Sequence, residues 1–212
     1  PLIRVRGAFA ATAIAEYFRD QGLDVVLLMD SLTRFAMAQR EIGLSIGEPA
    51  TTKGYTPSVF ASLPKLLERA GAIEGKGSIT GFYTVLVEGD DLREDPIADA
   101  SMAVLDGHIV LSRQLASRGL YPAIDPLLSL SRVMPHVVSK EHLELHHRFL
   151  EVMGVYKQYE DLVTIGAYSR GTNPKLDYAL DRIEAMFNFI RQDLDEKVDL
   201  ERSLEELKGL FA

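Results

Sequence analysis

The sequence predicts an α/β fold with a parallel sheet and flanking helices, followed by a small all-helical C-terminal domain. Strand-like and helix-like patterns alternate up to about residue 138, which is typical of parallel α/β layers. From residue 139 onward the pattern is helical almost throughout. The 212 residues include 47% hydrophobic side chains, enough to build a core. We therefore expect two domains, residues 1–138 and residues 139–212.

The first domain is expected to begin with a helix followed by a buried strand. Apolar residues recur at every fourth position over residues 10–21, as on one face of a helix. Residues 23–29 are apolar on both faces except at Asp24, as in a parallel strand covered by helices on both sides. A second helix is expected over residues 32–42.

The middle of the chain is marked by turn residues and by proline. Residues 44–57 contain two glycines and two prolines and are expected to form a loop, and loops of this length are often functional. Residues 78–87 are rich in β-favouring side chains and are expected to form a strand. Three pairs of a capping residue and a proline predict helix starts: Thr56-Pro57, Asp95-Pro96 and Asn173-Pro174.

The remaining elements are shorter in the first domain and longer in the second. Short strands are expected over residues 108–111 and 124–131, with a helix over residues 112–118 between them. In the second domain, helices are expected over residues 140–153, 155–164, 175–191 and 200–211.

Composition excludes several classes of protein. Lys and Arg number 23 against 31 Asp and Glu, a net charge of −8, which argues against general nucleic-acid binding. Residues 140–212 hold 10 basic and 15 acidic residues, so the acidity is concentrated in the helical end. The chain has no Cys, which excludes disulfides and thiolate metal sites and fits a reducing, cytosolic setting. The first residue is Pro1 rather than Met, and we expect the chain to be a piece of a longer protein.

Asp30 is the first candidate for chemistry because it directly follows the buried strand. The carboxyl edge of a parallel sheet is where α/β proteins bind ligands. In nucleoside triphosphatases an Asp at this place holds Mg²⁺, usually through water. The alternative is that Asp30 only caps the following helix.

A glycine-rich phosphate loop is not found in this sequence. Residues 71–78 come nearest, but three residues rather than four separate Gly71 from Gly75. The segment also follows a helix and precedes a strand, the reverse of the required order. We therefore interpret it as a turn with a solvated Lys76.

The histidines and the acidic loop have structural alternatives that are the commoner case. His142 and His146 share a helix face, with His136 nearby, but the spacing is not that of a zinc protease, and a solvated helix face is the alternative. Three carboxylates cluster after the strand over residues 78–87: Asp90, Asp91 and Asp95. Such a group serves acid–base catalysis or Ca²⁺ binding in some proteins, and more often forms turns, helix caps and surface contacts.

Two arginines are candidates for contact with phosphate. Arg132 ends the apolar segment over residues 124–131, and a guanidinium held at a sheet edge can stabilise charge on a transferring phosphoryl group. Arg34 lies one turn after Asp30 and is close enough to pair with it. An ordinary ion pair is the structural alternative for both.

The sequence resembles the type III protein-export ATPases over essentially its whole length, most nearly the flagellar export ATPases. The resemblance is carried by many segments: Leu28-Met29-Asp30-Ser31-Leu32-Thr33-Arg34-Phe35-Ala36, Gly47-Glu48-Pro49, Gly54-Tyr55, Pro57-Ser58-Val59-Phe60, Gly77-Ser78-Ile79-Thr80, Glu88-Gly89-Asp90-Asp91, Leu105-Asp106-Gly107-His108, Tyr121-Pro122-Ala123-Ile124-Asp125, Ser131-Arg132-Val133-Met134, Ile165-Gly166-Ala167-Tyr168 and Leu210-Phe211. Virulence-secretion ATPases are the near alternative, and both resemble the catalytic subunit of rotary ATP synthases.

The resemblance implies part of a RecA-like core that binds ATP and Mg²⁺ in a homohexamer. Asp30 then matches the Walker B aspartate, and Arg132 matches the arginine finger that reaches the neighbouring subunit's ATP. Arg34 matches an arginine near the nucleotide. The family's phosphate loop and catalytic glutamate precede the matched region, so we expect the chain alone to be inactive, or to be an assembly or partner-binding module. Rotary relatives carry an adenine-pocket aromatic near the place where Leu143 stands.

The resemblance also implies partners and a place in the cell. The loop with Asp90 and Asp91, together with Asp95, matches the region facing a central stalk. The acidic helical end matches the domain that meets stalk and regulator proteins, export chaperones and their substrates. The expected location is cytoplasmic, peripheral to the inner membrane at an export gate.

Overall fold

The computed structural model describes residues 1–89 and 91–212. The chain divides into two compact units, Pro1–Leu105 and Asp106–Ala212. The expected fold class, an α/β part followed by helices, is confirmed. Residues 106–138 are grouped with the helices that follow them, and the domain boundary after residue 138 stays a prediction.

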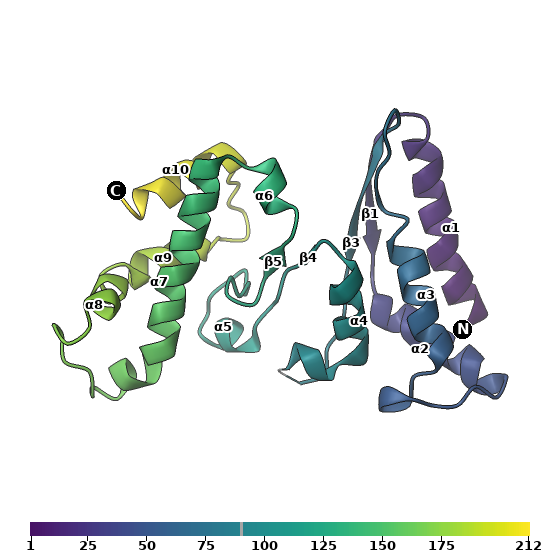
Figure 1. The fold of residues 1–212 in the computed structure, drawn as a ribbon, viewed down its shortest axis with the longest axis horizontal. Helices are drawn as coiled ribbons and strands as arrows, with labels where there is room; N and C mark the ends of the chain where they lie inside the picture. The colour runs from purple at the N-terminus through teal and green to yellow at the C-terminus, as the bar shows by residue number, and fades with distance from the viewer. Residues whose placement is uncertain (90) are drawn as a thin grey trace. The chain divides into compact units, whose positions relative to one another are not determined.

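The first unit is built on a three-stranded sheet with the strand order β1-β3-β2. The long strands β1 and β3 are parallel, with Asp24 opposite Ser78 and Met29 opposite Tyr83, and the short β2 is antiparallel to β3. The elements in chain order (Figure 1) are α1 (Leu2–Arg19), β1 (Asp24–Met29), α2 (Leu32–Ser45), η1 (Thr52–Gly54), α3 (Pro57–Leu67), β2 (Gly71–Ala72), β3 (Ser78–Tyr83), η2 (Leu92–Glu94) and α4 (Pro96–Val104).

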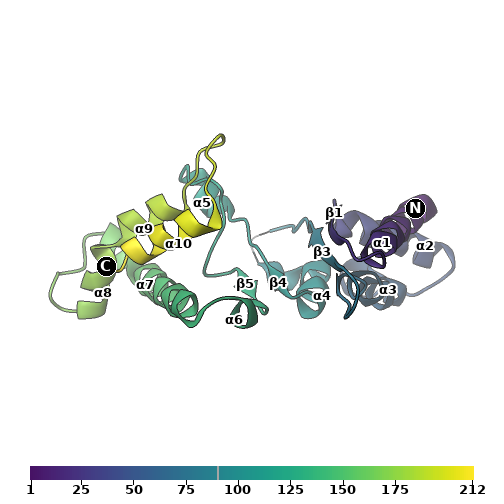
Figure 2. The same ribbon diagram turned by 90° about the horizontal axis from the view of Figure 1, so that it is seen from above.

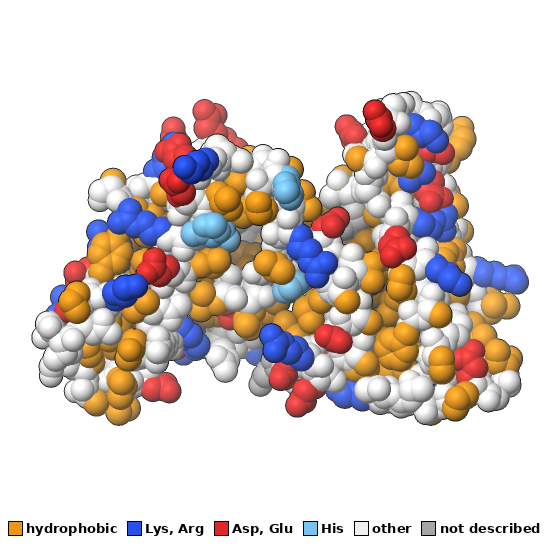
Figure 3. Space-filling model, in the orientation of Figure 1, with side chains coloured by type: hydrophobic (Ala, Val, Ile, Leu, Met, Phe, Trp, Pro, Cys, Tyr) orange, Lys and Arg blue, Asp and Glu red, His pale blue; other side chains and the backbone are white. Residues whose placement is uncertain are grey.

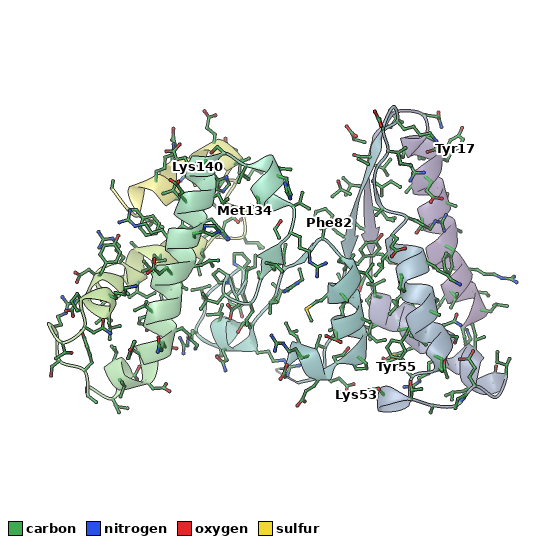
Figure 4. The ribbon with its side chains drawn as sticks, in the orientation of Figure 1. Tyr17, Lys53, Tyr55, Phe82, Met134 and Lys140 are labelled. Atoms are coloured by element: carbon green, nitrogen blue, oxygen red, sulfur yellow. The ribbon has the colours of Figure 1, made fainter. Side chains whose placement is uncertain are left out.

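The helices α1, α2 and α3 lie on one side of β1 and β3 (Figure 2). Leu27 and Ile79 face these helices and are buried. On the opposite face Val26, Leu28 and Phe82 are 66%, 75% and 51% exposed, and Phe82 points away from α1 (Figure 4). The expectation of helices on both sides of the first strand is therefore not met within this unit. We name Val26, Leu28 and Phe82 the outer sheet face.

Two of the three capping-residue pairs start their helices as predicted, and the third does so in part. Asp95 accepts hydrogen bonds from the amides of Ile97 and Ala98 at the start of α4. Asn173 does the same for α8. Thr56 stands at the N-cap of α3, but its side chain makes no capping bond because its hydroxyl pairs with that of Ser58.

The core of the first unit lies between the helices and the inner sheet face. Its fully buried members are Leu32 and Ala36 of α2, three residues of α3 and Ile97 of α4. The residues from α3 are Val59, Leu63 and Leu66, which recur at helical spacing. This packing fixes α2, and with it the turn that connects β1 to α2.

The second unit consists mainly of helices. Its elements are β4 (Gly107–His108), α5 (Arg113–Ser117), β5 (Leu130–Ser131), α6 (Met134–Val137), α7 (Lys140–Thr164), α8 (Pro174–Leu180), α9 (Ile183–Ile190) and α10 (Leu200–Gly209). The strands β4 and β5 form an antiparallel pair. Phe149, Met153 and Met186 are among the buried core residues that α7 and α9 contribute.

The apolar segment over residues 124–131 is not a continuous strand, which corrects the expectation. The Asp125 carboxylate accepts hydrogen bonds from the amides of Leu127 and Leu128, and this local bonding turns the chain. Only β5 and a bridge between Leu111 and Ile124 remain extended. The strand expected over residues 108–111 is likewise short.

Three helix boundaries also differ from expectation. The first helix begins at Leu2 rather than near residue 10. Helix α7 runs through Gly154 without a break, because a single glycine costs a helix only about 1 kcal/mol. The helix expected over residues 175–191 is divided into α8 and α9 at Arg182, where φ is −116°. The Arg182 guanidinium stacks on the Tyr178 ring at 3.7 Å.

A buried carboxylate connects the segment before the long helix to the helix itself. Glu160 of α7 accepts hydrogen bonds from Arg118 at 2.5 Å and Lys157 at 2.8 Å. Burial alone would raise the pKa of Glu160, but these two cations lower it below its usual value.

On the visible face of the molecule, acidic and basic side chains are interspersed over the helices (Figure 3). Within the described residues, none of the helices combines the length and apolarity of a membrane-spanning segment.

Candidate functional site

Asp30 lies at the carboxyl edge of the sheet, where the sequence predicted it. It directly follows β1, and Thr84 directly follows the parallel β3. Since parallel strands end at the same edge, the two side chains meet. The Thr84 hydroxyl donates a hydrogen bond of 2.8 Å to Asp30 Oδ1, and the Asp30 side chain is open to solvent.

The alternative capping role belongs to Ser31 and not to Asp30. Ser31 is the N-cap residue of α2, and its hydroxyl accepts a hydrogen bond from the Arg34 amide at 3.3 Å. The Asp30–Ser31 peptide bond is cis. Because Ser31 performs the capping, the Asp30 carboxylate remains for a ligand at the sheet edge.

Arg34 lies in the first turn of α2, and its side chain is exposed. Among the described residues no ion pair joins Arg34 to Asp30. The structural alternative for Arg34, a pair with Asp30, therefore finds no support. Its guanidinium lies on the helix that begins at the candidate site.

The acidic loop separates into residues of different character. Asp95 is buried, and its carboxylate caps α4, which favours a structural role over the expected partner contact. Asp91 is exposed and caps only the short η2 through the Arg93 amide. Asp90, also expected to contact a partner, lies outside the described residues.

Arg132 lies in the second unit, immediately after β5. Its amide donates a hydrogen bond of 2.7 Å to the Asp106 carbonyl, which fixes the backbone beside β4. The side chain is exposed. In the first unit, Asp30 directly precedes the start of α2 and Arg34 lies in its first turn, whereas Arg132 belongs to the second unit.

The glycine-rich segment over residues 71–78 is a strand and a turn. Lys76 makes an ion pair of 3.2 Å with Asp20. A Cβ atom on Gly77 would lie 1.9 Å from the Leu23 carbonyl oxygen, and the Gly77 amide donates to the Arg19 carbonyl. This glycine permits a close backbone approach beside β1, and the segment is not a phosphate loop.

The histidines of α7 do not form a metal site with other side chains. Among the described residues, no three His, Asp or Glu side chains come together in a way that could hold a metal ion. Burial and the neighbouring His147 and His142 lower the pKa of His146. His142 and His146 are half-buried rather than fully solvated, and His136 is exposed on the separate helix α6.

Sequence reasoning missed Thr84 and Thr33, which surround the turn with Asp30. Thr33 is buried and hydrogen-bonds both backbone groups of Leu86. The signal for Thr84 is the strand register: every paired residue of β1 matches one 54 positions later in β3, and residue 84 stands 54 positions after Asp30. Without the register, the sequence offers no reason to choose this hydroxyl.

The profile of the ATP synthase alpha/beta family, nucleotide-binding domain, matches residues 1–131. The chain belongs to the ATP synthase alpha/beta family. A second profile, the T3SS EscN ATPase C-terminal domain, matches residues 138–209. The first match thus includes β1 and Asp30 and ends at residue 131, and Arg132 lies between the two matched ranges.

Several proteins are similar to this chain over its whole length. The flagellum-specific ATP synthase of Pseudomonas aeruginosa is 59% identical, over 100% of this chain and 47% of that protein. The assembled ATPase EscN of enteropathogenic E. coli has a TM-score of 0.94 at 49% identity, over 100% of this chain and 51% of EscN. EscN in complex with its central stalk EscO gives 0.88 at 47% identity, over 100% of this chain and 50% of that chain. The chain spans about half the length of these relatives.

Proposed function

We propose that the parent protein of this chain is a Mg²⁺-dependent ATPase that energises the export of flagellar proteins by the type III route. The observation that carries the proposal is Asp30, an exposed carboxylate at the carboxyl end of a parallel strand in a chain of the ATP synthase alpha/beta family. The 59% identity to a flagellum-specific ATP synthase supports the same activity.

The chemistry of Asp30 fits a magnesium ion. Its Oδ1 atom is engaged by Thr84, and the side chain is exposed rather than used as a cap. Mg²⁺ prefers oxygen ligands and keeps several of its waters, so one carboxylate can hold it through water. When bound with ATP, the ion neutralises charge on the phosphate oxygens. Asp30 would orient the hydrated ion at the sheet edge.

Two arginines complete the proposed chemistry. Arg132 serves as the arginine finger, stabilising the negative charge of the phosphoryl group in the site of a neighbouring subunit. Arg34, in the first turn of α2, is the proposed arginine near the nucleotide. This assignment requires a homohexamer, and the likeness to the assembled EscN ATPase supports such an assembly.

The proposed partners follow from the exposed loop and the helical unit. The loop that includes Gly89 and Asp91 contacts a central stalk, in keeping with the likeness to EscN bound to EscO. The predicted helical domain, residues 139–212, contacts regulators, export chaperones and their substrates. The parent works in the cytoplasm, peripherally attached to the inner membrane at the export gate.

The flagellar system is preferred to a virulence secretion system. The flagellum-specific relative is 59% identical over the whole chain, whereas the type 3 secretion system ATPase of Xanthomonas euvesicatoria is 53% identical over 98% of it and EscN is 49% identical. A virulence secretion ATPase is the second candidate, since EscN matches the whole chain with a TM-score of 0.94. For the chain by itself, the alternative is a non-catalytic assembly or partner-binding module.

The Asp30→Asn variant of the full-length parent tests the proposed activity. The amide loses the negative charge that attracts the hydrated metal, so we expect hydrolysis to fall by about 100-fold. The matched control is Asp24→Asn, at the other end of β1, where Asp24 accepts a hydrogen bond from the Ser78 hydroxyl. Unchanged ATP hydrolysis by Asp30→Asn would remove the proposed metal site.

A further inference from the structure

Thr84 makes three hydrogen bonds to the turn that contains Asp30. Its amide donates to the Met29 carbonyl at 3.1 Å, and its carbonyl accepts from the Leu32 amide at 2.9 Å. Its hydroxyl donates to Asp30 Oδ1 at 2.8 Å. The two backbone bonds thus attach Thr84 to residues on either side of Asp30, and the hydroxyl bond attaches it to the Asp30 carboxylate itself.

A second threonine holds the segment with Thr84 in place. The Thr33 hydroxyl accepts from the Leu86 amide at 2.9 Å and donates to the Leu86 carbonyl at 3.3 Å. Thr33 is 8% exposed, so solvent competes little for these bonds. The chain from residue 84 to residue 86 therefore follows the turn between β1 and α2 as one hydrogen-bonded unit.

We infer that Thr84 is a positioning residue for Asp30. Its hydroxyl occupies one carboxylate oxygen, which restricts rotation of the carboxylate and leaves Oδ2 to accept hydrogen bonds from the waters of a bound magnesium ion. A partner that orients a metal-binding carboxylate contributes to metal affinity without touching the metal. This inference rests on the proposed function of Asp30.

A purely structural explanation exists and can be separated from the positioning role. At the opposite end of the same strand pair, the Ser78 hydroxyl donates to Asp24 at 2.7 Å. That bond has the same chemistry and the same separation of 54 residues, but it lies away from the candidate site. If hydroxyl–carboxylate pairs serve only to secure the strand ends, removing either hydroxyl has the same kind of effect.

The test compares Thr84→Val, Thr84→Ser and the control Ser78→Ala in the full-length parent. Valine keeps the β-branched shape and both backbone bonds, and serine keeps the hydroxyl. The readouts are the Mg²⁺ concentration that gives half-maximal binding of a non-hydrolysable fluorescent ATP analogue, and the kcat of ATP hydrolysis. We expect Thr84→Val to raise that Mg²⁺ concentration by about tenfold, with Thr84→Ser and Ser78→Ala within about twofold of the parent.

A double variant makes the result decisive. If Thr84 acts through Asp30, adding Thr84→Val to Asp30→Asn produces no further loss of Mg²⁺-dependent binding. Full additivity, or a wild-type Mg²⁺ requirement for Thr84→Val alone, overturns the inference. Failure of the proposed function gives a different result, in which Asp30→Asn by itself leaves Mg²⁺ dependence unchanged. Thermal unfolding of each variant verifies that the fold is retained.

Discussion

At the scale of the residue, Asp30 depends on neighbours that perform the structural tasks around it. Ser31 caps the helix, and Thr84 engages one carboxylate oxygen. A side chain that neither caps a helix nor forms an ion pair can bind a ligand. The same reasoning separates Asp95, whose carboxylate is buried and occupied by two amides, from the exposed Asp91.

The Arg132→Ala variant of the parent is expected to lower kcat strongly. An arginine finger acts on charge that develops during phosphoryl transfer, so its loss is expected to cost about 10³-fold in kcat with little change in nucleotide binding. Steady-state hydrolysis and nucleotide titration measure the two quantities. Arg113→Ala, at an exposed arginine of α5 in the same unit, is the matched control. An Arg132→Ala enzyme that turns over at the parent rate would end the finger assignment.

Individual residues were predictable where chemistry depends on sequence position alone. Asp30 follows an apolar strand, and the position by itself indicated a ligand at the sheet edge. Thr84 was not predictable in this way, because its contact with Asp30 depends on the register of two strands 54 residues apart. The burial of Asp95 also depends on tertiary packing.

At the scale of the element, one ion pair connects α1 to the end of α3. The Arg69 Nε atom donates to Glu16 Oε1 at 2.8 Å, and a second nitrogen contacts the other oxygen. Both side chains are about a quarter exposed. The hydrogen bond from Arg69 lowers the pKa of Glu16 below its ordinary value of 4.5. The pair is therefore charged at neutral pH and secures the first helix.

Glu16→Gln should destabilise the chain at pH 7 and much less under acidic conditions. Because the pKa of Glu16 is lower in the folded state, the pair stabilises the fold above about pH 4.5, and this contribution is lost as the pH falls through the lowered pKa. We expect a loss of about 1 kcal/mol at pH 7. Urea unfolding at several pH values measures it. The control is Glu68→Gln, at an exposed carboxylate next to Arg69; equal effects of the two variants at all pH values contradict the prediction.

Helix starts were easier to predict than strands and helix breaks. Asp95-Pro96 and Asn173-Pro174 carry their signal locally, and both begin helices. The segment over residues 124–131 has a strand-like composition, yet Asp125 turns it through its own neighbours' amides. The break at Arg182 accompanies its stacking on Tyr178, a contact that apolar periodicity does not reveal.

At the scale of the whole molecule, the central prediction concerns nucleotide binding by the 212-residue chain. The chain belongs to a nucleotide-binding family, but residues 71–78 form a strand and a turn rather than a phosphate loop. Backbone amides of such a loop provide much of the grip on phosphate. We therefore expect no micromolar ATP binding by calorimetry, against clear binding by the full-length parent under the same conditions. Micromolar binding by the chain alone would show that the loop is not essential.

The fold class was predictable for the whole molecule, because alternation of strands and helices is a property of sequence pattern. How the outer sheet face is covered was not. Residues 23–29 read as buried on both sides, yet Val26 and Leu28 are exposed in the described unit. An apolar pattern on both faces of a strand predicts that both faces are covered, but the helices of this unit cover only one face of β1.

The position of β1 at the end of the strand order has a consequence for handling the isolated chain. In the described sheet β1 pairs only with β3, so its other edge presents open amide and carbonyl groups next to apolar Val26 and Leu28. Edges of this kind are templates for intermolecular β-pairing. Association of chains through this edge will therefore limit the concentration at which the isolated chain stays monodisperse. Natural proteins protect edge strands with charged side chains, and the substitution Val26→Lys provides the same protection for the isolated chain.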